Sequence, residues 1–240
     1  KAMSGALFTC EDPAVWRKLY GKYWEVVEAK SLGKGKKSGK LLPLDKWFQE
    51  ELPVAIAGRA YKYVTQPELV KLMEWKLTRG KFRPRLQQLV ASNSDEMVEK
   101  CSRKAFSLLP DVQAAITELS SLKALGPATA SAVLAAGAPE QVAFMADEAV
   151  ESIPGLGPIQ YTPKHYALYL NKMATHTQTL NKVDSERDWT PHRVELCLWA
   201  WAVANQLQLP LLKDVNLENS LHNKSDPETN DRPAKRQRTK

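Results

Sequence analysis

The middle of the chain combines a turn that can bind phosphate with a carboxylate that can activate water. A predicted helix over 112–122 leads into a tight turn that ends in Gly126-Pro127, and an alanine-rich helix over 128–136 follows. The first N–H groups of this second helix lack intrahelical acceptors and lie at the positive end of its dipole, so they can hold one phosphate. Asp147 lies 21 residues after Gly126. An ionised aspartate can act as a general base.

Both features also have a structural interpretation. A turn containing Gly and Pro commonly joins two packed helices without binding a ligand. Asp147 can equally serve as the N-cap of a short helix through Glu148, Ala149 and Val150, because a cap needs only an acceptor at the first turn. Glu148 is then predicted to be an exposed acid of that turn. The residues alone leave both interpretations open.

The motif LKALGPATASAVL over 122–134, followed by Pro139 and then Asp147, resembles the hairpin and catalytic aspartate of the helix-hairpin-helix DNA glycosylase superfamily. Together with LMEWKLTRGKFRP over 72–84, it resembles more narrowly, and over much of the chain, the eukaryotic Amun-type glycosylase-like proteins. The resemblance implies a two-lobed helical fold, Asp147 as the catalytic residue and no cofactor. It also implies a DNA-phosphate site on the hairpin, formed by Leu125, Gly126, Ala128 and Thr129.

The hairpin departs from the superfamily pattern at two positions. Ala128 stands where bifunctional members carry a lysine nucleophile, and Ala124 replaces the first glycine of the turn. The resemblance therefore implies a monofunctional enzyme without lyase activity. In such an enzyme a nucleotide is flipped into a pocket between the lobes, and Asp147 assists hydrolysis of its N-glycosidic bond. The alternatives on the same fold are a non-catalytic DNA- or chromatin-binding module and a protein-interaction module.

Helices must position these residues, since no segment shows sustained period-two alternation and helix start signals recur along the chain. Predicted N-caps, three of them followed by proline, are Asp12, Thr65, Ser94, Thr162 and Thr190. Another helix is predicted to start near Asp45 and to be interrupted by Pro53. We therefore predict an all-α fold, with a helical domain over 1–212 that contains the hairpin at about 112–136. The core helices are predicted to end near Leu212, and from Asn219 onward polar and charged residues dominate without an apolar stripe. Residues 213–240 are therefore predicted to form a disordered basic tail.

The charge of the chain favours an acidic partner, with a formal net value of +7 to which the tail contributes. We predict DNA as the partner, bound through its backbone without sequence reading, and expect nuclear protein partners as well. Basic contacts are predicted at Lys81, Arg83 and Lys123. The stretch 75–85 interleaves aromatic and basic side chains, as in a nucleic-acid face or, alternatively, in a helix end whose cations complement the dipole. A predicted nuclear localisation signal comprises Lys235, Arg236, Arg238 and Lys240.

Other residue types argue against several classes of protein. Cys10, Cys101 and Cys197 are scattered without a CxxC pair, which indicates buried thiols rather than disulfides, zinc ribbons or Cys-ligated clusters. No metal site is predicted, because the histidines show no ligand spacing. The sequence GKGKKSGK over 33–40 lacks the glycine spacing and the Ser or Thr of a phosphate loop. The longest apolar run, 196–204, is too short to cross a membrane. The oligomeric state stays open.

Overall fold

Helices are the only regular secondary structure in residues 5–33, 39–215 and 217, the part of the chain that the computed structural model describes. This confirms the predicted all-α fold class. The first helices are α1 (Ala6–Thr9), α2 (Pro13–Gly21), α3 (Tyr23–Ser31), α4 (Leu41–Lys46), α5 (Leu52–Ala57), α6 (Gln66–Arg79) and α7 (Pro84–Ala91). They are followed by α8 (Asp95–Ser107), α9 (Val112–Leu119), α10 (Pro127–Gly137), α11 (Asp147–Glu151), α12 (Pro163–Val183) and α13 (Pro191–Gln206). A π turn (Trp47–Glu51) connects α4 to α5, and a 3₁₀ turn (Pro210–Lys213) follows α13.

The predicted N-caps all start helices, because each side chain accepts a hydrogen bond from an N–H group of the first turn. These residues are Asp12 of α2, Thr65 of α6, Ser94 of α8, Thr162 of α12 and Thr190 of α13. At α6 the cap is reciprocal, since the Glu68 carboxylate accepts a hydrogen bond from the Thr65 N–H at 2.8 Å. Each cap stabilises its helix by about 1 kcal/mol. These bonds are local, so short sequence motifs were sufficient to predict where these five helices begin.

The helix predicted near Asp45 begins earlier, at Leu41, and its path continues through Pro53 as α5. Inside an unbroken α-helix, proline removes a hydrogen bond and clashes with the carbonyl four residues before it. Here the π turn comes directly before α5 and widens the spiral, and Pro53 falls in the first turn of α5, where an N–H group has no helical acceptor. The α-helix is therefore interrupted just before Pro53, as predicted, but by a π turn, which has no simple sequence signature.

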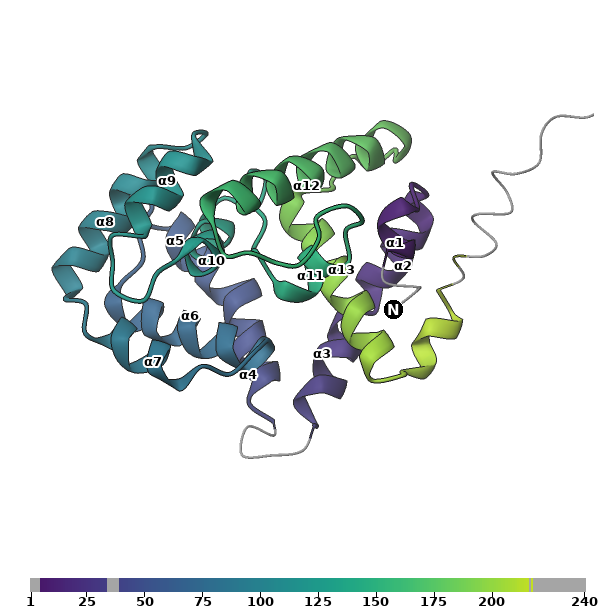
Figure 1. The fold of residues 1–240 in the computed structure, drawn as a ribbon, viewed down its shortest axis with the longest axis horizontal. Helices are drawn as coiled ribbons and strands as arrows, with labels where there is room; N and C mark the ends of the chain where they lie inside the picture. The colour runs from purple at the N-terminus through teal and green to yellow at the C-terminus, as the bar shows by residue number, and fades with distance from the viewer. Residues whose placement is uncertain (1–4, 34–38, 216, 218–240) are drawn as a thin grey trace, which may run out of the picture.

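Two helices, α10 and α13, form the centre of the core. Residues 128–136 of α10 are all buried, as are most residues of α13, and a helix that is apolar on every side must be surrounded by others. The contacts of α10 are with α5, α6, α9 and α12, whereas α13 packs against α1, α2, α3, α11 and α12. Figure 1 shows α8 and α9 at one end of the molecule, α1 and α2 toward the other, and α10 and α11 between them.

Some predictions concern residues at or beyond the limits of the described chain. The basic cluster Lys235, Arg236, Arg238 and Lys240 lies outside the described residues, as does most of the 33–40 loop. Val215 and Leu217 are buried, so packing extends past the predicted domain boundary at residue 212.

The three cysteines are free and buried, as predicted. Within the described ranges, no helix has the length and apolar character needed to cross a membrane.

Candidate functional site

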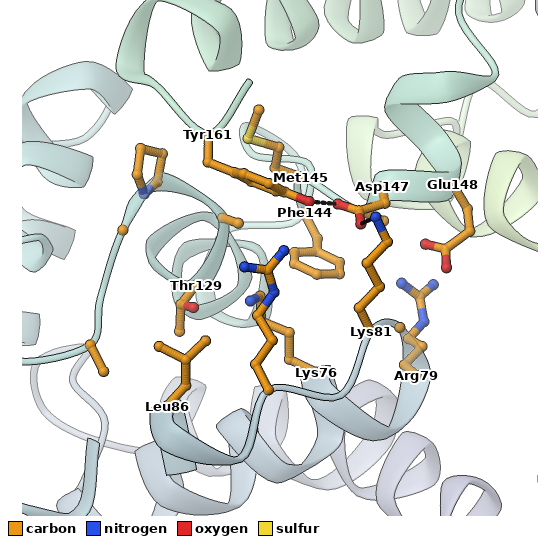
Figure 2. Close-up of a pocket in the computed structure, with 17 residues that line it drawn as sticks. Lys76, Arg79, Lys81, Leu86, Thr129, Phe144, Met145, Asp147, Glu148 and Tyr161 are labelled. Atoms are coloured by element: carbon orange, nitrogen blue, oxygen red, sulfur yellow. Dashed lines mark hydrogen bonds and ion pairs between the residues drawn. The ribbon is translucent and has the colours of Figure 1, made fainter. Parts of the chain in front are cut away.

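A pocket of about 240 Å³ lies where the N-terminal end of α10, the segment before α11 and the C-terminal end of α6 meet. Its walls come from Ala124, residues 126–129, residues 144–148, part of the stretch 76–86, and Tyr161. Figure 2 shows Asp147, Tyr161 and Lys81 grouped together, with Thr129 in another wall of the same cavity. The structure thus brings the predicted hairpin and the predicted catalytic residue to one place.

The Asp147 carboxylate lines this pocket and is held by two contacts. Its Oδ1 accepts a hydrogen bond from the Tyr161 hydroxyl at 2.6 Å, and its Oδ2 lies 3.6 Å from Lys81 Nζ. The N-cap interpretation was wrong, because the N-cap of α11 is Ala146 and no side chain caps that helix. Glu148, predicted to be exposed, is half-buried and also lines the pocket. The Asp147 side chain is 18% exposed, so it is shielded from bulk water but reachable.

Tyr161 is a site residue that the sequence did not indicate. Burial raises the pKa of its hydroxyl, and the hydrogen bond to Asp147 raises this pKa further, so the group stays protonated and donates. The guanidinium of Arg83 lies 5.7 Å from the centre of the Tyr161 ring. In the sequence, the position of Tyr161 next to the Thr162 cap indicated a helix start. It did not indicate which cavity the Tyr161 ring would enter.

The N-terminus of α10 is open to the pocket. Its N-cap is Gly126, which offers no side-chain acceptor, and the N–H groups of Ala128 and Thr129 have no hydrogen-bond partner in the described structure. A Cβ added at Gly126 would meet no atom within 4 Å, so the backbone is accessible there. Leu125 differs from its prediction as a phosphate contact, because its N–H already donates to the Leu122 carbonyl and its side chain is buried. The N–H group of Gly126 likewise has no partner among the described residues, so three N–H groups of this turn are left without an acceptor.

Ala124 adopts a left-handed backbone conformation, with φ at 71°, at the position where the resemblance predicts glycine. This conformation costs a residue with a Cβ about 1–2 kcal/mol. We expect Ala124→Gly to raise the free energy of unfolding by about 0.5–1 kcal/mol, after the larger backbone entropy of unfolded glycine is deducted. Denaturant unfolding measures this change. The matched control, Ala114→Gly in α9, should have the opposite sign, and a destabilised Ala124→Gly protein would contradict the argument.

The three predicted basic contacts occupy different positions. Lys81 and Arg83 are exposed and line the pocket, where Lys81 approaches Asp147 and Arg83 lies over Tyr161. Lys123 is exposed on the turn before α10 but does not line the cavity. The backbone of Lys123 is instead bonded twice to Asn93, whose amide accepts from its N–H at 2.9 Å and donates to its carbonyl at 3.0 Å. Asn93 thereby holds the turn that leads into α10.

A buried ion pair lies behind the pocket. In the sequence, the stretch 75–85 indicated a nucleic-acid face or a helix end whose cations complement the dipole, and neither interpretation predicted this ion pair. Arg79 lines the cavity yet is only 1% exposed, and its guanidinium donates to both carboxylate oxygens of Glu195, at 2.7 and 3.2 Å. Asp45 lies 3.9 Å from Arg79 Nε and accepts hydrogen bonds from Tyr23 and Trp75. Burial raises the pKa of Glu195 to about 7, although the Arg79 charge acts in the opposite direction. This network joins α6 to α13 under the site.

Comparison of the chain with protein-family models, with curated proteins and with solved structures finds no match.

Proposed function

We propose that this protein binds DNA and hydrolyses the N-glycosidic bond of one nucleotide, with Asp147 as its catalytic carboxylate. The observation that carries the proposal is that Asp147 shares one pocket with the uncapped N-terminus of α10. A phosphate site beside a carboxylate can hold a nucleotide by its backbone while chemistry takes place at the bond between sugar and base. The resemblance to helix-hairpin-helix DNA glycosylases, and to the Amun-type group, supports the same two-lobed fold and chemistry.

The phosphate would be bound by groups that read no sequence. The free N–H groups of Ala128 and Thr129 point out of the first turn of α10, at the positive end of its dipole. The Thr129 hydroxyl makes no hydrogen bond within the described residues and can add a donor. Arg83 and Lys81 supply positive charge at the same rim. This arrangement matches sequence-independent contact with the DNA backbone.

The cavity size and its carboxylate fit a single flipped nucleotide. Its 240 Å³ lies below the roughly 300–1,000 Å³ of pockets for drug-sized ligands, which suits one base rather than a stretch of strand. Asp147 would either stabilise positive charge on the sugar or take a proton from the attacking water. In the second case the water oxygen bonds to C1′, and the base leaves with the electron pair of the broken C1′–N bond. Tyr161 would orient the carboxylate through its hydrogen bond.

A second candidate is a non-catalytic DNA- or chromatin-binding module. The observation that favours it is that both Asp147 oxygens already have partners, Tyr161 and Lys81, so the carboxylate can be a structural link between α11 and the segment after α6. This candidate predicts DNA binding that does not depend on a damaged base. The third alternative, a protein-interaction module, predicts no DNA affinity.

Binding experiments separate DNA contact from the protein-interaction alternative. We expect affinity for a duplex to fall steeply as salt rises, because released counterions drive the association. Arg83→Gln should weaken binding for all sequences and reduce the slope of log affinity against log salt by about one. Fluorescence anisotropy with labelled duplexes measures both quantities. Lys18→Gln, on an exposed position of α2 outside the pocket, is the control that should match wild type.

A protein with no affinity for DNA at low salt would contradict this proposal. Release of a base, detected as alkali-sensitive strand breakage, tests its catalytic half. The same proposal places the protein in the nucleus, with Lys235, Arg236, Arg238 and Lys240 as the sequence signal for import. Nuclear protein partners remain part of the proposal.

A further inference from the structure

The pocket wall formed by α10 carries several hydrogen-bond donors without partners. Three are the N–H groups of Gly126, Ala128 and Thr129. A fourth is the Thr129 hydroxyl, which makes no hydrogen bond within the described residues although Thr129 is only 2% exposed. Figure 2 shows this side chain in the wall of the cavity. A polar group shielded from bulk water costs free energy when it lacks a partner, so an acceptor bound here would be favourable.

Lys76 adds an amine to these donors from the facing helix. It lies in the last turn of α6, is half-buried and lines the pocket. Neither a hydrogen bond nor an ion pair holds its Nζ in the described part of the chain, whereas Lys81 is paired with Asp147. Figure 2 shows the Lys76 side chain extending into the cavity, with Thr129 on one side of it and Asp147 on the other. Burial lowers the pKa of its amine, and a bound anion would favour the charged form.

The carboxylates of the pocket lie away from these donors. Figure 2 shows Asp147 and Glu148 across the cavity from Thr129. The charge of Asp147 is partly compensated, because its Oδ2 lies 3.6 Å from Lys81 Nζ. On the opposite side, the positive end of the α10 dipole, the Lys76 amine and the Arg83 guanidinium line one cavity. This side of the pocket therefore suits an anion that carries more than one negative charge.

The number of donors indicates which phosphate fits best. A phosphodiester inside a strand carries one negative charge and has two free oxygens, whereas a phosphomonoester carries about 1.5 to 2 negative charges at pH 7 and has three acceptor oxygens. The unpaired donors are three N–H groups, one hydroxyl and one amine. Three acceptor oxygens can engage all of these groups, and the second negative charge matches the added lysine.

We propose that this pocket binds a phosphomonoester, with Lys76 and Thr129 as ligands, so that it takes the nucleotide at a phosphorylated strand end. This inference rests on the proposed function, because it names the phosphate by which the substrate nucleotide is held. The terminal phosphate would lie against α10 and Lys76, and the sugar would extend toward Asp147 in the same cavity.

Fluorescence anisotropy with end-modified duplexes tests the inference. One duplex carries a 5′ phosphate and a second carries a 3′ phosphate. A third has hydroxyl ends and one extra base pair, so that its total charge is no lower. We expect a phosphorylated duplex to bind at least about tenfold more tightly than the third, the gain expected from a further hydrogen bond between charged groups. Comparison of the first two identifies which end enters the pocket.

Two variants show whether this preference arises in the pocket. Lys76→Gln should remove most of it, because the positive charge is lost, and Thr129→Val, which removes only the hydroxyl, should reduce it. Lys71→Gln is the matched control and should keep the preference, because Lys71 is an exposed lysine of the same helix that does not line the pocket. Thermal unfolding checks that every variant is folded.

Equal affinity for the three duplexes, or a preference that Lys76→Gln retains in full, would overturn the inference. Titration calorimetry with a nucleoside 5′-monophosphate and a nucleoside 3′-monophosphate separates it from the proposed function. Binding of either that depends on Lys76, in a protein without affinity for a duplex, contradicts the proposed function alone. Salt-sensitive duplex binding without any preference for a phosphorylated end contradicts the present inference alone.

Discussion

Asp147→Asn should reduce the rate of base excision by about 10²–10⁴-fold, the range that a positioned acid–base group contributes. Asparagine has nearly the same shape and its carbonyl oxygen can still accept the hydrogen bond from Tyr161, so the pocket should keep its form. It has no negative charge and cannot take a proton from water. DNA affinity should stay close to wild type, because the proposed phosphate contacts are the uncapped N–H groups of α10 and not Asp147. Single-turnover kinetics with excess protein separates the chemical step from binding.

Two variants show whether this effect belongs to the carboxylate itself. Glu151→Gln changes another acid of the same short helix that does not line the pocket, and it should leave the rate unchanged. Tyr161→Phe removes only the hydroxyl that orients Asp147, and the rate should fall less, by about tenfold. An Asp147→Asn protein that excises at the wild-type rate would show that Asp147 has a structural role only.

Glu195→Ala should lower the free energy of unfolding by about 3–5 kcal/mol, because it leaves the Arg79 charge buried without its bidentate partner. That is a large part of the about 5–15 kcal/mol by which a domain is stable. Asp45, at 3.9 Å from Arg79 Nε, compensates only in part, since its oxygens already accept bonds from Tyr23 and Trp75. Urea unfolding gives the measurement.

The control for Glu195→Ala is Glu28→Ala, which truncates an exposed glutamate of α3 and should change stability by less than about 0.5 kcal/mol. Replacing both charges, as in Arg79→Met with Glu195→Leu, should recover part of the loss, because no unpaired guanidinium remains. A Glu195→Ala protein within about 1 kcal/mol of wild type would show that water or Asp45 satisfies Arg79.

The helices and their starts could be predicted because their signals are local. A cap such as Thr65 and its partner Glu68 are three residues apart, so both are visible in one short motif. The π turn at 47–51 was missed, since no short motif comparable to a cap marks it in the sequence.

The site could be predicted only in part. The turn before α10 and Asp147 were found through one compact motif, and the structure places them in one pocket. Tyr161 reaches Asp147 across 14 residues, and Arg79 meets Glu195 across 116, so both contacts depend on helix packing that no spacing rule gives. Arg79 and Lys76 are three residues apart on α6, yet one is buried in an ion pair and the other enters the cavity unpaired.

We propose above that the Asp147 pocket removes a base from DNA. The most direct measurement incubates the wild-type protein with a panel of duplexes, each bearing one damaged or mismatched base, and then cleaves abasic products with alkali. We expect strand breakage at the modified nucleotide for at least one lesion class, at a rate that depends on Asp147. Salt-sensitive binding to these duplexes, with no breakage across the whole panel, would contradict it and leave a DNA-binding module without catalysis.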